Sequence, residues 1–187
     1  MQDEQITELC GKIYSQHRKA IDLIIANKPD RRDFVAFQVK KLIKAAKLID
    51  DDSSRAYIRF TSDAFASPFL TGSIEWTESK RLVLYEFRNE INGLSLIVQL
   101  GRGDQSKRAL ILKTTHDFGA PFKPEKKLYT KWNRLYKFDI LDENDYELSD
   151  KEITKKVEEK WQEFLKTDFP KIEHAFKSHS WPITPAD

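Results

Sequence analysis

The sequence predicts an α+β fold: an N-terminal helical hairpin, a central antiparallel sheet of about four or five strands, and a long C-terminal helix. Three observations predict it. Apolar residues recur at helical spacing over residues 1–50 and again over 149–178. Between these regions, from 55 to 141, the pattern changes to the alternation of half-buried strands. A length of 187 residues suits a single domain that combines all three regions.

The N-terminal region is predicted to be the helical hairpin. One helix is expected over 3–26, where leucines and isoleucines recur on one face. A second helix follows Asp30 and runs to about residue 50, and the short connection at 27–30 is typical of two antiparallel helices. Cys10, the single cysteine, lies on the apolar stripe of the first helix and is expected to be a buried structural thiol.

The clearest strand signal is a β-hairpin from Leu82 to Leu100. Its two apolar arms flank Asn92-Gly93, a dipeptide that supplies the positive φ angles of a type I′ turn. Shorter strands are expected at 57–60 and 73–76, and a further strand at 129–140. Together these segments predict the antiparallel sheet.

Two further helices complete the predicted fold. A short helix is expected over 105–116. The C-terminal helix begins with a capping box, in which Ser149 is the N-cap and Glu152 the third helical residue. Pro170 should interrupt this helix, because proline lacks the backbone N–H and collides with the preceding turn.

Composition and charge narrow the classes of function. The chain has 32 Lys and Arg against 30 Asp and Glu, a net charge of +2, which argues against binding nucleic acid through bulk charge. No apolar run approaches the roughly 20 residues of a membrane span. The first residues are acidic and lack the apolar core of a signal peptide. We therefore expect a cytoplasmic protein with no membrane partner.

One candidate for catalysis lies on the first arm of the β-hairpin. Glu86-Phe87-Arg88 is similar to the (D/E)-x-K element of metal-dependent nucleases, in which strand carboxylates hold Mg²⁺. Glu75 or Asp63 would supply the second carboxylate. Arg88 stands where the lysine is needed, and arginine cannot act as a base. The sequence favours the alternative, in which Glu86 and Arg88 are same-face charges on a solvated sheet. No catalytic residue, metal site or cofactor is thus predicted, and Mg²⁺ is needed only by the nuclease alternative.

A basic and aromatic stretch is the main candidate for binding. Lysines can neutralise phosphates while exposed rings stack on bases. The alternative is an amphipathic strand with its rings in the core and its lysines in water. The candidate nucleic-acid-binding residues are Lys123, Lys126, Lys127, Lys131, Trp132, Arg134 and Lys137.

Arg102 is a candidate phosphate ligand. It lies between Gly101 and Gly103, whose backbone N–H groups could face a phosphate. The alternative is an ordinary loop at the end of a strand.

Several short segments, in order along the chain, carry a family resemblance. They are Leu9-Cys10, Ile13-Tyr14, His17 to Ile24 ahead of Pro29-Asp30, Tyr57-Ile58-Arg59, Glu86 to Asn89 and Leu94 to Gly101. In this order they resemble the region that follows the nuclease core in a group of poorly characterised bacterial members of the PD-(D/E)XK nuclease superfamily. The resemblance implies that the catalytic acids and lysine belong to an upstream part, so no catalytic residue is carried over to this chain.

The sequence therefore favours a non-catalytic binding or accessory domain of a nuclease-like bacterial or phage system. Its expected partner is DNA, RNA or another protein. Two alternatives stay open: a reduced Mg²⁺-dependent nuclease of the PD-(D/E)XK type, and a small inhibitor or adaptor that acts by protein–protein contact.

Overall fold

The computed structural model of the chain describes residues 2–26 and 30–182. The chain divides into two compact units, Met1–Asp30 and Arg31–Asp187. The first contains one helix, α1 (Gln2–Ala26), as predicted, with a kink where His17 departs from helical geometry. The connection at 27–29, where the sequence predicts the turn of the helical hairpin, lies outside the described residues.

The apolar stripe of α1 is exposed within its own unit. Ile6, Leu9 and Ile13 are each about half exposed, at 56%, 58% and 46%. Cys10 is exposed beside them. The prediction of a buried thiol is therefore wrong, because a single helix offers no second layer against which its stripe could be buried.

The second unit is built on a five-stranded sheet with the strand order β1-β2-β3-β4-β5. Every neighbouring pair is antiparallel, so the sheet is a meander. This arrangement, with the helices before and after it, confirms the predicted α+β class. The strands are β1 (Ile49–Asp50), β2 (Tyr57–Thr61), β3 (Val83–Glu90), β4 (Gly93–Leu100) and β5 (Asn133–Leu141).

One of the predicted strands is wrong. Residues 73–76 form an irregular segment in which Glu75 has a positive φ angle of 52°. The remaining strand is β1, which pairs with Phe60 and Thr61. It forms because α2 ends earlier than expected, at Ala45, and Lys47 turns the chain with a φ angle of 56°.

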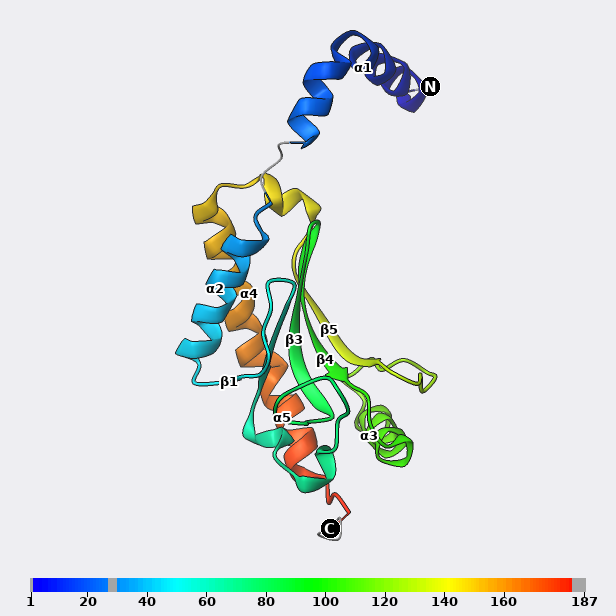
Figure 1. Cartoon of the computed structure of the whole chain (residues 1–187), viewed down its shortest axis with the longest axis vertical. Helices are drawn as coiled ribbons and strands as arrows, with labels where there is room; N and C mark the ends of the chain where they lie inside the picture. Colours follow the sequence, from blue (N-terminus) through cyan, green and yellow to red (C-terminus); the bar gives the residue numbers. More distant parts are fainter. Residues whose placement is uncertain (1, 27–29, 183–187) are drawn as a thin grey trace. The chain divides into compact units, whose positions relative to one another are not determined.

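The helices of this unit are α2 (Arg32–Ala45), α3 (Gln105–Phe118), α4 (Asp150–Thr167) and α5 (Phe169–Ser178), with short 3₁₀ turns at 63–65, 68–70 and 143–147. α2 and α4 lie side by side against the sheet (Figure 1). The predicted capping box is confirmed: Ser149 accepts from the Glu152 N–H, and the Glu152 carboxylate accepts from the Ser149 N–H. The predicted interruption is also confirmed, since α4 and α5 are separated at Asp168, just ahead of Pro170.

The predicted β-hairpin is confirmed, but its turn lies one residue earlier. Glu90 pairs with Gly93, so the connecting residues are Ile91 and Asn92, and neither has a positive φ angle. Gly93 belongs to β4. A Cβ atom there would come 3.2 Å from the backbone oxygen of Leu141. Glycine is therefore favoured by the close approach of β5 rather than by the turn.

The core lies on one face of the sheet. Phe60 of β2 stacks on Tyr85 of β3 with ring centroids 4.9 Å apart, and Trp161 of α4 packs against Phe60 and Phe87. The buried apolar residues of α2, α3, α4 and α5 belong to this same cluster. Among the described residues of the second unit, these four helices thus cover one face of the sheet. The alternate strand residues lie on the other, which we call the helix-free face.

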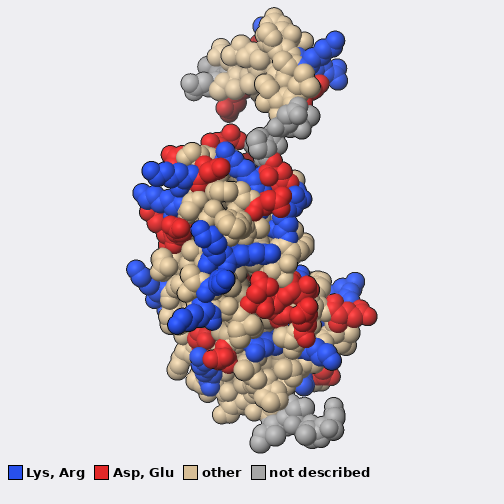
Figure 2. Space-filling view, turned by 60° about the vertical axis from the view of Figure 1, so that its left-hand side comes forward, with Lys and Arg blue, Asp and Glu red and all other residues tan. Residues whose placement is uncertain are grey.

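The outer surface of the helices carries mixed charge. Figure 2 shows basic and acidic side chains next to one another on this side of the molecule. Lys40, Lys41 and Lys44 of α2 are exposed, as expected of a solvated helix face. In the parts of the chain that the structure describes, no helix is long and apolar enough to cross a membrane.

Candidate functional site

The helix-free face brings polar side chains of neighbouring strands together. On β2 and β3, Tyr57 lies opposite Arg88, and Arg59 lies opposite Glu86. Because side chains alternate along a strand, these four point to the same side of the sheet. Gln99 of β4 lies beside them on the same face and bonds to Arg88.

Glu86 holds two arginines in place. Its side chain is almost fully buried, at 3% exposure. Its Oε2 accepts a hydrogen bond from Arg59 Nε at 2.8 Å, and its Oε1 accepts from Arg88 Nε at 3.2 Å. A buried carboxylate is tolerated only when it is paired and hydrogen-bonded. Glu86 therefore acts as an anchor that fixes both guanidinium groups.

Arg88 has a second anchor. Its Nη2 donates to Gln99 Oε1 at 3.0 Å. Gln99 is itself buried, at 2% exposure, and its amide nitrogen donates to the backbone oxygen of Leu100 at 3.2 Å. The plane of the Arg88 guanidinium is thus fixed along one edge by two buried side chains.

Aromatic rings border the arginines. Trp76 packs against the backbone of Gly101, where a Cβ atom would come 1.8 Å from the ring. It meets Trp132 edge-to-face at 5.1 Å, and the Arg59 guanidinium lies 5.4 Å from the Tyr57 ring. Trp76 is buried, whereas Tyr57 is 47% and Trp132 39% exposed. Two of the three rings therefore offer a surface to a ligand.

The helix-free face contains two adjoining hollows. The first, which we call the tryptophan hollow, has a volume of about 350 Å³. The second, the lysine hollow, has a volume of about 250 Å³ and includes Ser95, Lys137 and Asp139. Arg88 lines both, so the two hollows meet at this residue. The tryptophan hollow is lined by Tyr57, Arg59, Trp76, Glu86, Arg88, Gln99 and Trp132.

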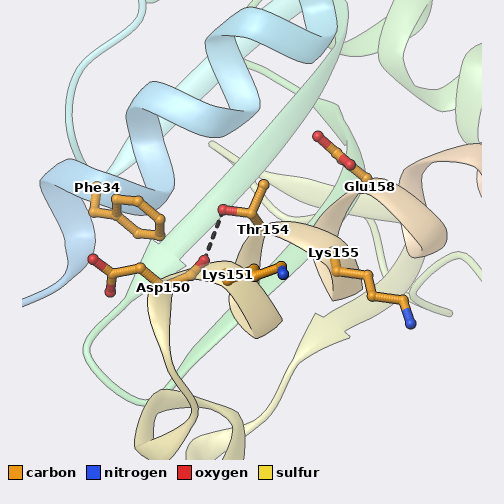
Figure 3. Close-up of a pocket in the computed structure, with 6 residues that line it drawn as sticks. All are labelled: Phe34, Asp150, Lys151, Thr154, Lys155 and Glu158. Carbon is orange, nitrogen blue, oxygen red and sulfur yellow. Dashed lines mark hydrogen bonds between the residues drawn. The ribbon is translucent and has the colours of Figure 1, made fainter.

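A third hollow lies on the helical side, between the start of α2 and α4 (Figure 3). It is larger, at about 490 Å³, and Phe34 forms one wall. Its charged side chains, such as Lys155 and Glu158, extend away from one another into solvent. Ligand sites have a few polar groups that converge on one point. For this reason we place the candidate site on the helix-free face.

The two carboxylates of the nuclease alternative bond to different arginines. Both oxygens of Glu86 accept from arginine, as described above. Glu75 lies on the loop ahead of β3, is 79% exposed, and forms an ion pair with Arg102 at 3.4 Å. Within residues 2–26 and 30–182, no three His, Cys, Asp or Glu side chains are grouped so that they could hold a metal ion.

Packing explains the Gly-x-Gly sequence around Arg102. Gly101 lies under Trp76, and a Cβ atom at Gly103 would come 2.3 Å from the Leu82 side chain. The Arg102 guanidinium lies 6.0 Å from the Trp132 ring and pairs with Glu75. Arg102 therefore borders the tryptophan hollow through Trp132, and its glycine neighbours serve the packing of the loop.

Most of the basic candidates lie on the connection between α3 and β5, a loop that projects from the sheet (Figure 1). This loop folds back along the start of β5, since the Lys123 N–H donates to the Leu135 carbonyl at 3.0 Å. The exposed residues here are Lys123, Lys126, Lys127, Lys131 and Arg134. Lys137, farther along β5, is exposed in the lysine hollow and forms a 2.6 Å ion pair with Asp139.

A fully buried arginine anchors the same loop. Arg108 of α3 donates to the backbone oxygens of Tyr129 and Thr130 at 2.7 and 3.1 Å, and to Asn133 Oδ1 at 3.1 Å. Burial lowers the pKa of its guanidinium. The loop that leads to Trp132 is therefore held from the core side.

A register shift places Trp132 on the helix-free face. Gln99 pairs with Arg134, so that Leu135 is the extra residue of a β-bulge. The bulge reverses the alternation. Tyr136 points into the core, whereas Trp132 and Arg134 point to the other side. The alternative interpretation, an amphipathic strand with its rings in the core, therefore holds for Tyr136 but not for Trp132.

Sequence reasoning missed four residues of the tryptophan hollow: Tyr57, Arg59, Trp76 and Gln99. The two-residue spacing of Tyr57 and Arg59 matches that of Glu86 and Arg88, and this was the available signal. It becomes informative only when the pairing register of the two strands is known.

Comparison with known proteins finds no match: no protein-family model, no curated protein and no solved structure matches the chain significantly.

Proposed function

We propose that the chain is a non-catalytic binding domain whose helix-free face binds single-stranded nucleic acid. One observation carries the proposal: two exposed rings, Tyr57 and Trp132, border an arginine that is fixed from below by the buried Glu86. Aromatic side chains on an open sheet stack on unpaired bases, and neighbouring cations contact the backbone.

A single strand fits this face better than a duplex. The bases of a duplex are already stacked on one another, so exposed rings gain little from it. The chain has a net charge of only +2, which offers a duplex little general attraction. The exposed Lys126, Lys127 and Lys131, on the loop before β5, would neutralise phosphates of a strand that crosses the two hollows.

The biological setting is part of the same proposal. The resemblance to nuclease accessory regions supports a role in a nuclease-like bacterial or phage system, in which this domain holds a strand that another module cuts. The contacts of Glu86 favour binding over cutting, because both of its oxygens are engaged by arginines rather than turned toward a metal ion.

The test is the fluorescence anisotropy of labelled single-stranded DNA and RNA over a range of salt concentrations. We expect log K to fall linearly with log salt, and the slope to decrease by about one for each phosphate-contacting lysine that is replaced. Replacing Lys126, Lys127 and Lys131 by alanine should lower the slope. Replacing Lys40, Lys41 and Lys44 of α2, on the helical side, should not.

A second pair of variants tests stacking. Trp132→Ala should weaken binding by about 1–3 kcal/mol. Phe37→Ala, which removes another exposed ring from α2, should leave the affinity unchanged. Absence of binding to every strand, or equal effects of the site and control variants, would refute the proposal.

Contact with a partner protein is a second candidate function, favoured by the exposed apolar stripe of α1. Cys10 lies on this stripe and is the only cysteine, so a photo-cross-linker attached to its thiol reports on what touches α1. We expect a cross-linked adduct that disappears in Leu9→Asp. An adduct that is unchanged by Leu9→Asp would argue against a specific contact.

A further inference from the structure

We infer that Arg88 recognises guanine in the bound strand, with the base seated in the tryptophan hollow. This inference rests on the proposed function and adds the base for which the site is selective. It starts from the hydrogen-bonding capacity of one side chain. A guanidinium group has five N–H donors in a rigid planar fork and no acceptor.

Two of these donors are already engaged. Nε donates to Glu86 and Nη2 to Gln99, and both acceptors lie along one edge of the guanidinium plane. Among the described residues, Nη1 of Arg88 has no hydrogen-bond partner. The end of the fork therefore keeps two parallel N–H groups, one on each terminal nitrogen. The Arg88 side chain is 37% exposed and lines both hollows, so these donors face a ligand.

Two parallel donors require two acceptors side by side. Guanine presents such a pair in N7 and O6. Adenine places an amino donor beside its N7 acceptor, and in thymine an N–H donor separates the two carbonyl groups, so neither base matches the fork. Unpaired cytosine does have two adjacent acceptors, N3 and O2, but its single ring gives Trp132 less surface for stacking than a purine does. An arginine that is held in one plane can therefore distinguish guanine from adenine and thymine by its hydrogen bonds.

A phosphate group could also accept two parallel hydrogen bonds, but the surroundings favour a base. Arg59 and Arg88 are accompanied by Glu86, and by Asp52 at 3.7 Å from Arg59, so the formal charges of these four residues sum to zero. A site without excess positive charge gives an anion little advantage. The exposed Trp132 ring, in contrast, offers a stacking surface that a base can use and a phosphate cannot.

The anchoring of Arg88 supports selectivity. A long, free side chain loses rotamer freedom when it binds, and it can turn to suit different ligands. Arg88 is fixed by Glu86 and Gln99, which are both almost fully buried. Its donors therefore have one direction before the ligand arrives, which penalises bases whose acceptors do not match.

The experiment uses the full chain and short thymidine strands that differ only at one central position. We expect the strand with a central guanine to bind roughly 5- to 150-fold more tightly than the strand with a central adenine. A central 7-deazaguanine, which lacks the N7 acceptor, should lose most of this preference. The base analogue changes the ligand alone, so this result does not depend on the folding of a protein variant.

Protein variants provide the complementary measurement. Arg88→Lys keeps the charge but lacks the fork, so its affinity for the guanine strand should fall more than its affinity for the all-thymidine strand, and the preference for guanine should be lost. Arg134→Ala, the control on β5, should weaken binding to all strands by the same factor.

Equal binding of the guanine and adenine strands overturns the inference and leaves the proposed function intact. A uniform loss in Arg88→Lys points to a phosphate contact and also overturns it. Absence of binding to any strand overturns both.

Discussion

Arg59 and Glu86 lie directly opposite each other on β2 and β3, and the Arg59 Nε donates to the Glu86 Oε2 at 2.8 Å. The Glu86 side chain is 4% exposed and the Arg59 side chain 15% exposed. Such a desolvated pair adds little net stability compared with apolar residues, but each partner depends on the other. The base of the tryptophan hollow is therefore sensitive to the loss of a single charge.

We expect Glu86→Gln to lower the free energy of unfolding by roughly 3 kcal/mol, because Arg59 and Arg88 lose the counter-charge between them. Urea denaturation measures this change. The control is Glu75→Gln, which removes an exposed partner of Arg102 and should change stability by less than about 1 kcal/mol. Equal stabilities of Glu86→Gln and the parent protein would mean that water screens the pair.

Arg108 links the stability of the fold to the site. Arg108→Met removes two hydrogen bonds to loop carbonyl groups and one to the buried amide oxygen of Asn133, so we expect a loss of about 2–4 kcal/mol in unfolding free energy. Strand binding should weaken as well, because the loop carries Trp132. Thermal unfolding and anisotropy measure the two effects. Lys113→Met, an equivalent change on the exposed side of α3, should alter neither, and similar effects of the two variants would contradict this role.

The elements of the fold were predictable where their signal is local. The capping box at Ser149, the helix at 105–116 and the two arms around residue 92 each show their pattern within a few residues. The misses depended on distant contacts. β1 has two residues, too few to show a period, and it exists because β2 lies beside it. Gly93 is explained by Leu141, almost fifty residues away in the sequence.

The candidate site was predictable only in part, for the same reason. Their spacing placed Glu86 and Arg88 on one face, and Trp132 was singled out by its basic neighbours. The prediction that this face is solvated holds for Arg88 but is wrong for Glu86, which is 3% exposed because two arginines cover it. Trp76 could not be foreseen, because it reaches the site through an irregular loop that covers Gly101. The orientation of Trp132 depends on the bulge in β5, which the sequence does not reveal.

Tyr85 should make the stability of the protein sensitive to alkaline pH. Burial, reinforced by the nearby carboxylate of Glu173, raises the pKa of its hydroxyl well above the ordinary value. A raised pKa in the folded state gives stability that is complete below the unfolded pKa, about 10, and is lost as the pH rises beyond it.

Tyr85→Phe should therefore be less stable than the parent protein at neutral pH, by about 1 kcal/mol for the lost hydrogen bond. The difference between the two proteins should shrink above about pH 10, because only the parent gains from ionisation of this tyrosine on unfolding. Urea denaturation at a series of pH values measures it. A difference that stays constant into the alkaline range would contradict the assignment.

Gly101→Ala should open the tryptophan hollow. The added Cβ would meet the Trp76 ring at 1.8 Å, far inside van der Waals contact, so the indole must move. We expect Trp76 to become more exposed, its edge-to-face contact with Trp132 to be lost, and strand binding to weaken. Acrylamide quenching of tryptophan fluorescence and anisotropy measure these changes. Gly11→Ala, where nothing lies within 4 Å of the new atom, should affect neither quenching nor binding. If Gly101→Ala binds normally while Trp76 is displaced, then Trp76 is not needed to shape the binding surface, and stacking rests on Trp132 and Tyr57 alone.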